Sequence, residues 1–106
     1  MHVILWRFRA RPGREAEFEE AYGADGIWAR FFRDGADYLG SELMRGSDGV
    51  YLTIDRWVSR RLFETFQEEF ADDYRELDKT LEDLIMIETR LGAFENVRAS
   101  ELASDT

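Results

Sequence analysis

A tight-turn signal in the middle of the chain restricts the possible folds more than any other feature. The signal is Gly46-Ser47-Asp48-Gly49, and glycine and aspartate tolerate the positive φ angles that hairpin turns require. The flanking segments 38–45 and 50–57 are typical of β-strands, so the sequence predicts an antiparallel hairpin. Along 50–57 alternate side chains take opposite faces of the sheet, with Val50, Leu52, Ile54 and Arg56 on one face and Tyr51, Thr53, Asp55 and Trp57 on the other.

Two further strands are predicted near the ends of the chain. Residues 2–11 are rich in β-branched and aromatic side chains, and Pro12-Gly13 is expected to end that strand. Its first half is apolar on both faces, which indicates a strand that is covered on both sides. Residues 86–95 predict the other strand, in which Ile87, Thr89, Leu91 and Ala93 alternate with Met86, Glu88, Arg90 and Gly92.

The segment between the first two predicted strands has apolar residues at helical spacing. Residues 14–22 predict a short amphipathic helix that ends at Gly23. A second helical piece follows, with Asp25 as its expected N-cap. Its apolar stripe consists of Ile27, Trp28, Phe31 and Phe32.

A longer helical segment precedes the last strand. Ser59 is its expected N-cap, and apolar residues keep helical spacing as far as residue 85. A break is expected near residues 70–72. The elements then follow the order β-α-β-β-α-β, which predicts an α+β, ferredoxin-like fold with an antiparallel sheet.

This fold predicts how the chain is organised and how it assembles. With 106 residues there is room for one domain, expected over residues 1–95, and the polar segment 96–106 is expected to fray. Helices cover only one face of a ferredoxin-like sheet, so the apolar residues on the other face need a cover. Pairing with a second copy is the simplest solution, and we expect a homodimer through this face.

Composition narrows the classes of function. The net charge is −9 and Lys79 is the only lysine, which argues against a nucleic-acid partner. There is no cysteine, which excludes disulfides and thiolate chemistry and suits a cytoplasmic protein. The apolar stretch 3–6 is too short to span a membrane. Phosphate-binding, nucleophile-elbow and metal-hydrolase motifs are missing from the sequence, and the acidic residues of the second half are expected to be a solvated helix face and not a metal site.

Three segments resemble the antibiotic biosynthesis monooxygenase family, and the similarity extends over roughly residues 2–95. They are Tyr22-Gly23-Ala24-Asp25-Gly26-Ile27-Trp28, Tyr38-Leu39-Gly40-Ser41-Glu42-Leu43 and Tyr51-Leu52-Thr53-Ile54-Asp55-Arg56-Trp57. The resemblance implies a dimer in which two sheets pack into an α/β barrel, with a cavity between the sheet and helices of each subunit. Some relatives oxidise quinols or aromatic polyketides with molecular oxygen and without a cofactor.

Other relatives degrade haem, and they hold the iron through a helical histidine together with an Asn and a Trp. Here the only histidine is His2, at the start of the first strand, and the only asparagine is Asn96, near the end of the chain. Haem degradation by that arrangement is therefore not expected, and neither is any other cofactor.

Trp28 and Asp55 are the candidate catalytic residues. The indole N–H of Trp28 can donate a hydrogen bond to a substrate oxygen, although an aromatic residue at helical spacing also suits a packing role. Asp55 can serve as a base if its face of the sheet lines the cavity, because partial burial raises the pKa of a carboxyl. If that face meets a partner subunit, Asp55 is instead expected to pair with an arginine. The sequence alone does not choose the face.

Four other residues are candidates for substrate binding, and each has a structural alternative. Tyr22 and Tyr51 can offer phenolic hydroxyls or pack in the core. Trp57 can stack on a ring, or it can close the end of the sheet or the dimer interface. Arg56 can stabilise a phenolate or form a salt bridge to a neighbouring strand.

We therefore expect a cofactor-independent, monooxygenase-like protein that acts on a small aromatic or quinol-type substrate. One alternative is a non-catalytic dimeric binding module for an aromatic metabolite. Another is a structural homodimer whose aromatic residues only fill the core and the interface.

Overall fold

A four-stranded antiparallel sheet forms one layer of the molecule. The computed structural model describes residues 1–35 and 37–97. The strands are β1 (His2–Ala10), β2 (Tyr38–Arg45), β3 (Tyr51–Trp57) and β4 (Ile85–Glu95). They lie in the order β2-β3-β1-β4, and every neighbouring pair is antiparallel. This order confirms the predicted ferredoxin-like arrangement.

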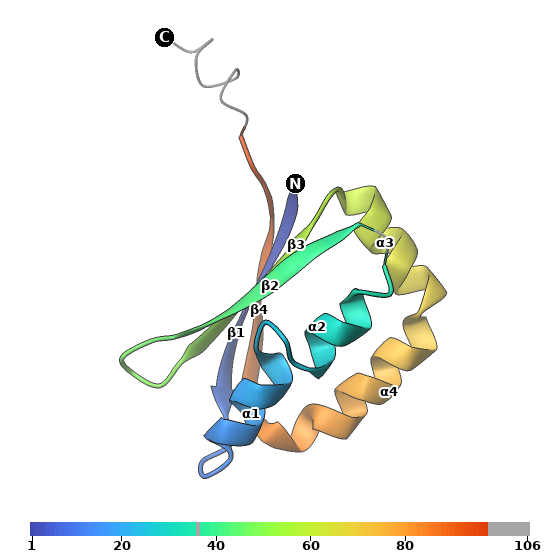
Figure 1. Cartoon of the computed structure of the whole chain (residues 1–106). Helices are drawn as coiled ribbons and strands as arrows, with labels where there is room; N and C mark the ends of the chain where they lie inside the picture. Colours follow the sequence, from blue (N-terminus) through green and yellow to red (C-terminus); the bar gives the residue numbers. More distant parts are fainter. Residues whose placement is uncertain (36, 98–106) are drawn as a thin grey trace, which may run out of the picture.

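The helices form a second layer on one side of the sheet (Figure 1). They are α1 (Glu15–Tyr22), α2 (Ile27–Phe32), α3 (Arg60–Glu69), α4 (Ala71–Leu81) and the short 3-10 turn η1 (Glu82–Leu84). No helix in the described part of the chain is long and apolar enough to cross a membrane. The predicted tail lies almost entirely outside the described residues, which stop at Val97.

The hairpin between β2 and β3 forms where the sequence predicts it. Gly49 has a φ of +82°, the left-handed region that glycine favours. The amide of Gly46 donates to the carbonyl of Val50 at 2.7 Å, and the side chain of Asp48 accepts from the amide of Val50 at 3.1 Å. These bonds fix the register, which places Ser41 opposite Asp55.

The core lies between the sheet and the helices and is mainly aromatic. Trp57 and Phe18 are fully buried, and Ile4, Phe8, Tyr51 and Phe66 are nearly so. The face of β3 that carries Tyr51, Thr53, Asp55 and Trp57 is therefore the helix-covered face, and this settles the choice that the sequence left open. Val3, Leu5, Leu52 and Ile54 lie on the opposite, uncovered face and are only half-buried.

The long helical segment is divided where the sequence predicts a break. The backbone of Phe70 leaves helical geometry, ends α3 and begins α4. Ser59 caps α3 as expected, because its side chain accepts a hydrogen bond from the amide of Leu62 at 3.2 Å. α3 and α4 therefore meet the sheet as separate helices.

The predicted cap of α2 is wrong. Gly26 occupies the N-cap position, and Asp25 instead forms an ion pair with Arg33 at 2.9 Å. A Cβ at position 26 would come within 2.3 Å of the carbonyl oxygen of Ala21, so only glycine fits this tight connection between α1 and α2. That close approach favours glycine over a side-chain cap.

The predicted alternation of β4 is also wrong beyond residue 90. Arg90 pairs with Trp6 and Gly92 with Leu5, so Leu91 is the extra residue of a β-bulge. Gly92 has a φ of +145°, which suits this irregularity. The faces exchange there, and Ala93 joins Glu88 and Arg90 on the helix-covered side instead of facing away from them.

Candidate functional site

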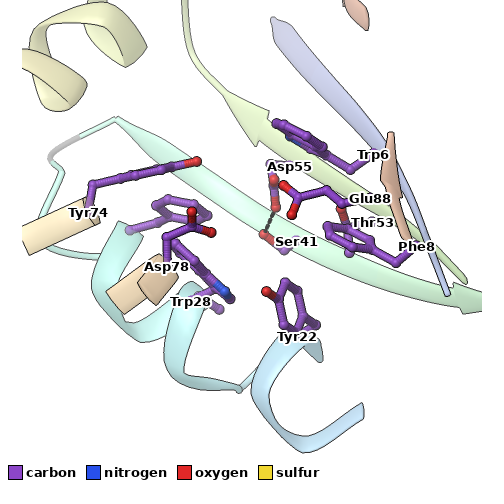
Figure 2. A pocket seen from close by; sticks show the side chains of 12 residues that line it. Trp6, Phe8, Tyr22, Trp28, Ser41, Thr53, Asp55, Tyr74, Asp78 and Glu88 are labelled. Atoms are coloured by element: carbon purple, nitrogen blue, oxygen red, sulfur yellow. Dashed lines mark hydrogen bonds between the residues drawn. The ribbon is translucent and has the colours of Figure 1, made fainter. Parts of the chain in front are cut away.

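A cavity lies between the sheet and the helices, at the level where α2 and α4 face the centre of the strands. Its volume is about 40 Å³, measured as the space open to the centre of a water molecule. Side chains from seven elements line it, and half of the lining residues are aromatic (Figure 2). The lining residues are Trp6, Phe8, Tyr22, Trp28, Ala29, Phe32, Ser41, Thr53, Asp55, Tyr74, Asp78 and Glu88.

The inner wall contains a hydrogen-bond donor without an acceptor. Trp28 is 8% exposed, and its indole N–H has no partner among the described residues. Figure 2 shows this nitrogen turned toward the hydroxyl of Tyr22 at the edge of the cavity. Burial raises the pKa of Tyr22, and the indole N–H of Trp28 opposes part of that rise, so it lies close enough to act on the hydroxyl but outside the geometry of a hydrogen bond. An unpaired buried donor is costly, so the geometry favours a ligand that brings an acceptor here.

Asp55 lies on the sheet side of the cavity at the end of a short hydrogen-bond chain. The hydroxyl of Ser41 donates to Oδ1 of Asp55 at 2.5 Å. Tyr38 and Ser41 join their hydroxyls at 2.5 Å, and Tyr38 is the donor when Ser41 donates to Asp55. Burial raises the pKa of Asp55 from 3.8 to about 6, while the Ser41 hydrogen bond lowers it. Asp55 is therefore mainly ionised at pH 7 and is a stronger base than an ordinary aspartate.

The outer wall is acidic and comes from α4 and β4. Tyr74 and Asp78 are separated by one turn of α4, and Glu88 projects from β4. Burial raises the pKa of Tyr74 to about 12, and Asp78, Asp55 and Glu88 add to this rise. Burial also raises the pKa of Glu88, and the negative charge of Asp78 contributes. The charges of these side chains therefore interact across the mouth of the cavity.

Three of the six predicted site residues line this cavity, and three lie elsewhere. Asp55, Trp28 and Tyr22 meet around it. Tyr51 is buried at the other end of the sheet, where its hydroxyl donates to Glu19 at 2.6 Å. Trp57 is fully buried and packs edge-to-face on Phe32.

The third of these residues, Arg56, lies on the uncovered face of the sheet. Its guanidinium pairs with the carboxylate of Glu42 at 2.6 Å. This is the structural alternative that the sequence offered for Arg56, a salt bridge to a neighbouring strand. The pairing keeps Arg56 on the far side of the sheet from the cavity.

Sequence reasoning missed the residues that α4 and β4 bring to the cavity. Tyr74 belongs to the apolar stripe of the long helix, which gave no reason to single it out, and Asp78 and Glu88 resemble ordinary surface acids. Ser41 had a usable signal, because the hairpin register alone pairs it with Asp55. Within residues 1–35 and 37–97, no group of three or more His, Cys, Asp or Glu side chains is arranged to hold a metal ion.

The fold is that of antibiotic biosynthesis monooxygenase structures. SnoaB, a cofactor-independent oxygenase from Streptomyces nogalater, is 20% identical over 92% of this chain and 94% of its own, with a TM-score of 0.68. A putative antibiotic biosynthesis monooxygenase from Bordetella bronchiseptica is 18% identical over 92% and 97%, with a TM-score of 0.67. Rv0793 from Mycobacterium tuberculosis is 14% identical over 93% and 97%, with a TM-score of 0.68.

These likenesses confirm the predicted resemblance at the level of the fold. No family model matches the sequence, and no curated protein matches it either. At sequence identities of 20% or less, the similarity shows only a shared fold. Evidence for a reaction therefore has to come from the residues of the cavity.

Proposed function

We propose that the chain is a cofactor-independent monooxygenase-like protein that binds a small phenol or quinol in this cavity. One observation supports the proposal: Asp55 and Trp28 line the same cavity. The pKa of the Asp55 carboxyl is raised, and the buried indole N–H of Trp28 has no acceptor. A base and an anion-stabilising donor are the two groups that activation of a phenol requires. The fold shared with SnoaB, a cofactor-independent oxygenase, supports the same reaction class.

The proposed roles follow from position. Asp55 removes the phenolic proton, and Ser41 holds the carboxylate toward the cavity. The resulting phenolate oxygen accepts a hydrogen bond from the indole of Trp28, with the hydroxyl of Tyr22 beside it. The proton moves from the ring to Asp55, so the net charge inside the cavity does not change. Charge is redistributed in a space shielded from bulk water, where an oriented donor is most effective.

Molecular oxygen is the oxidant in the proposed reaction. An ionised phenol passes one electron to molecular oxygen, and the radical pair combines at a ring carbon ortho or para to the oxygen. Loss of water from the peroxide then leaves a quinone. For a phenol with a hydrogen on that carbon, one substrate and one oxygen molecule give one quinone and one water, so no external reductant is consumed.

The cavity as it stands is too small for the substrate, so we propose that one wall moves. Roughly 10–15 Å³ by the same measure holds one water, so about 40 Å³ accommodates a few waters and not an aromatic ring. α4 is the wall that can yield, because none of its residues is buried. We propose that α4 swings outward to admit the substrate and closes over it.

Oxygen uptake with a panel of phenols and hydroquinones tests this function. The panel is first screened with wild-type protein. Asp55→Asn is expected to reduce uptake at least 100-fold because the base is lost, and Trp28→Phe about tenfold to 100-fold because the donor is lost while an aromatic ring remains. Trp57→Phe is the matched control, since Trp57 lies outside the cavity.

Two outcomes would redirect the proposal. Equal uptake by Asp55→Asn and wild type would remove Asp55 from the mechanism. Ligand binding that depends on Trp28, with no uptake of oxygen by any phenol, would favour the alternative of a non-catalytic binding module for an aromatic metabolite.

We also propose that the uncovered face of the sheet forms a homodimer in an α/β-barrel arrangement. Apolar side chains from all four strands lie on this face, where Met44 is 50% exposed, Ile87 49% and Phe94 51%. An apolar sheet surface of this kind usually marks an interface.

A further inference from the structure

The cavity has an uneven distribution of charge. The neutral donors Trp28 and Tyr22 line its buried side, and the carboxyl groups of Asp78 and Glu88 line its exposed side, from which their charge still reaches Tyr22. Both acidic side chains are exposed, so they lie at the mouth of the cavity. Neither forms an ion pair within the described part of the chain.

No arginine or lysine of the described residues lines this cavity, but Arg90 lies to one side of it. It lines a neighbouring cavity that shares four lining residues with this one: Trp6, Phe32, Asp55 and Tyr74. It does not line the cavity itself, and its charge reaches Tyr74, whose pKa it lowers slightly against the larger effects of burial and the carboxylates. The space between Asp55, Asp78 and Glu88 is therefore negative overall.

We propose that this site selects phenols whose far end carries a cationic or hydrogen-bond-donating group and discriminates against aromatic carboxylates. The inference deepens the proposed function, because it rests on a phenol binding with its oxygen toward Trp28. Trp28 is 8% exposed, and its indole N–H faces the cavity without an acceptor, so it orients the ligand (Figure 2). The opposite end of the ring then lies between Asp78 and Glu88.

This orientation has a physical reason. The phenolic oxygen is the acceptor that Trp28 lacks, and a carboxylate in that place would also sit close to ionised Asp55. At the mouth, a ligand ammonium would be attracted by two carboxylates, and a ligand carboxylate would be repelled by both. A positive group there also favours ionisation of the phenol, since it offsets negative charge that otherwise opposes the phenolate.

Calorimetric titration with three matched probes tests the selection. Tyramine, tyrosol and 4-hydroxyphenylacetate share a 4-hydroxyphenyl ring and end in an ammonium, a hydroxyl and a carboxylate. We expect tyramine to bind about tenfold tighter than tyrosol, and 4-hydroxyphenylacetate to bind at least tenfold more weakly than tyrosol. Raising the salt concentration should weaken tyramine binding and leave tyrosol unchanged.

Variants that replace one carboxylate with a neutral amide test whether the carboxylates at the mouth cause the selection. Asp78→Asn and Glu88→Gln should each weaken tyramine binding about fivefold, leave tyrosol within twofold and strengthen 4-hydroxyphenylacetate. Glu76→Gln is the control, because Glu76 lies exposed on the same helix and outside the cavity. It changes the net charge equally and should alter none of the three affinities by more than twofold.

The outcomes separate this inference from the function on which it rests. If all three probes bind equally and Trp28→Phe weakens them all, the aromatic site stands and the charge selection is wrong. If 4-hydroxyphenylacetate binds tightest, the selection has the opposite sign and the inference fails. If no probe binds, both the inference and the proposed ligand site are overturned.

Discussion

Asp55 is the residue whose environment differs most from that of an ordinary surface acid. Its register opposite Ser41 follows from the hairpin, and its burial follows from the aromatic side chains around it. The sequence predicted Asp55, Trp28 and Tyr22 as site residues because their types suit phenol chemistry. It did not predict Tyr74, Asp78 or Glu88, because only tertiary packing brings α4 and β4 to the same cavity.

The raised pKa of Asp55 predicts a pH-dependent cost to stability. The pKa is 3.8 for an ordinary aspartate and about 6 in the folded protein, so the folded state binds more protons between these values. The contribution of Asp55 to the free energy of unfolding therefore falls as pH rises from 4 to 6 and stays low above pH 7. Asp55→Asn should stabilise the protein by about 1–3 kcal/mol at pH 8.

Urea denaturation of wild type and Asp55→Asn at pH 4 and pH 8 measures this difference. At pH 4 the two proteins should differ by less than about 1 kcal/mol, because Asp55 is then mostly neutral in the folded state. A variant that is less stable than wild type at pH 8 would show that the charged carboxylate is a net stabilising group. Asp37→Asn is the control, because Asp37 is a partly exposed turn residue outside the cavity.

Trp28 offers a second prediction at the same scale. Trp28→Phe keeps an aromatic ring in contact with Tyr22 and Phe32 but removes the buried N–H that lacks an acceptor. Loss of packing volume and relief of the unpaired donor oppose each other, so the free energy of unfolding should change by less than about 1.5 kcal/mol. A loss above 3 kcal/mol in urea denaturation would show that the indole is mainly a packing group.

At the scale of elements, the α1–α2 connection positions the inner wall of the cavity. Gly26 lies between Tyr22 and Trp28, and its Cα approaches the backbone of α1 too closely for a side chain. Gly26→Ala should therefore destabilise the protein by about 2 kcal/mol or more, because backbone has to move. Ala24→Ser, an exposed position in the same connection, should change stability by less than about 0.5 kcal/mol in thermal or urea unfolding.

α4 is expected to be the least protected helix of the cavity wall. None of its residues is buried, and the backbone break at Phe70 separates it from α3. Amide hydrogen exchange should be faster in residues 73–81 than in β1 and β3, and a bound phenol should slow it. Equal protection of α4 and the central strands, with no change on binding, would contradict the proposed opening.

The elements also show where sequence patterns reach their limit. The hairpin, the division of the long helix and the Ser59 cap were predicted, because each depends on residues close in sequence. The bulge at Leu91 was not, since it depends on how β4 pairs with β1. Gly92 was the available signal, because a glycine within a strand often marks a bulge.

At the scale of the whole molecule, the uncovered sheet face predicts self-association. Sedimentation should give a species of twice the chain mass of 12.5 kDa at micromolar concentration. Leu5→Glu places a charge at the centre of this face, opposite Ile54, and should yield a folded monomer. Ile27→Glu, an exposed apolar position on α2 in the opposite layer, should remain dimeric. A stable wild-type monomer would remove the dimer from the account.

The proposed function requires a phenol to bind against Trp28 inside the cavity, and the indole N–H resonances of the three tryptophans report on that contact. Trp6 and Trp28 line the cavity, whereas Trp57 is fully buried outside it. In ¹H–¹⁵N correlation spectra assigned with Trp28→Phe, titration with tyramine should shift the Trp28 indole signal most, downfield as it gains an acceptor, and leave Trp57 nearly unchanged. A Trp28 signal that does not move while other resonances saturate would place the ligand elsewhere and contradict the account.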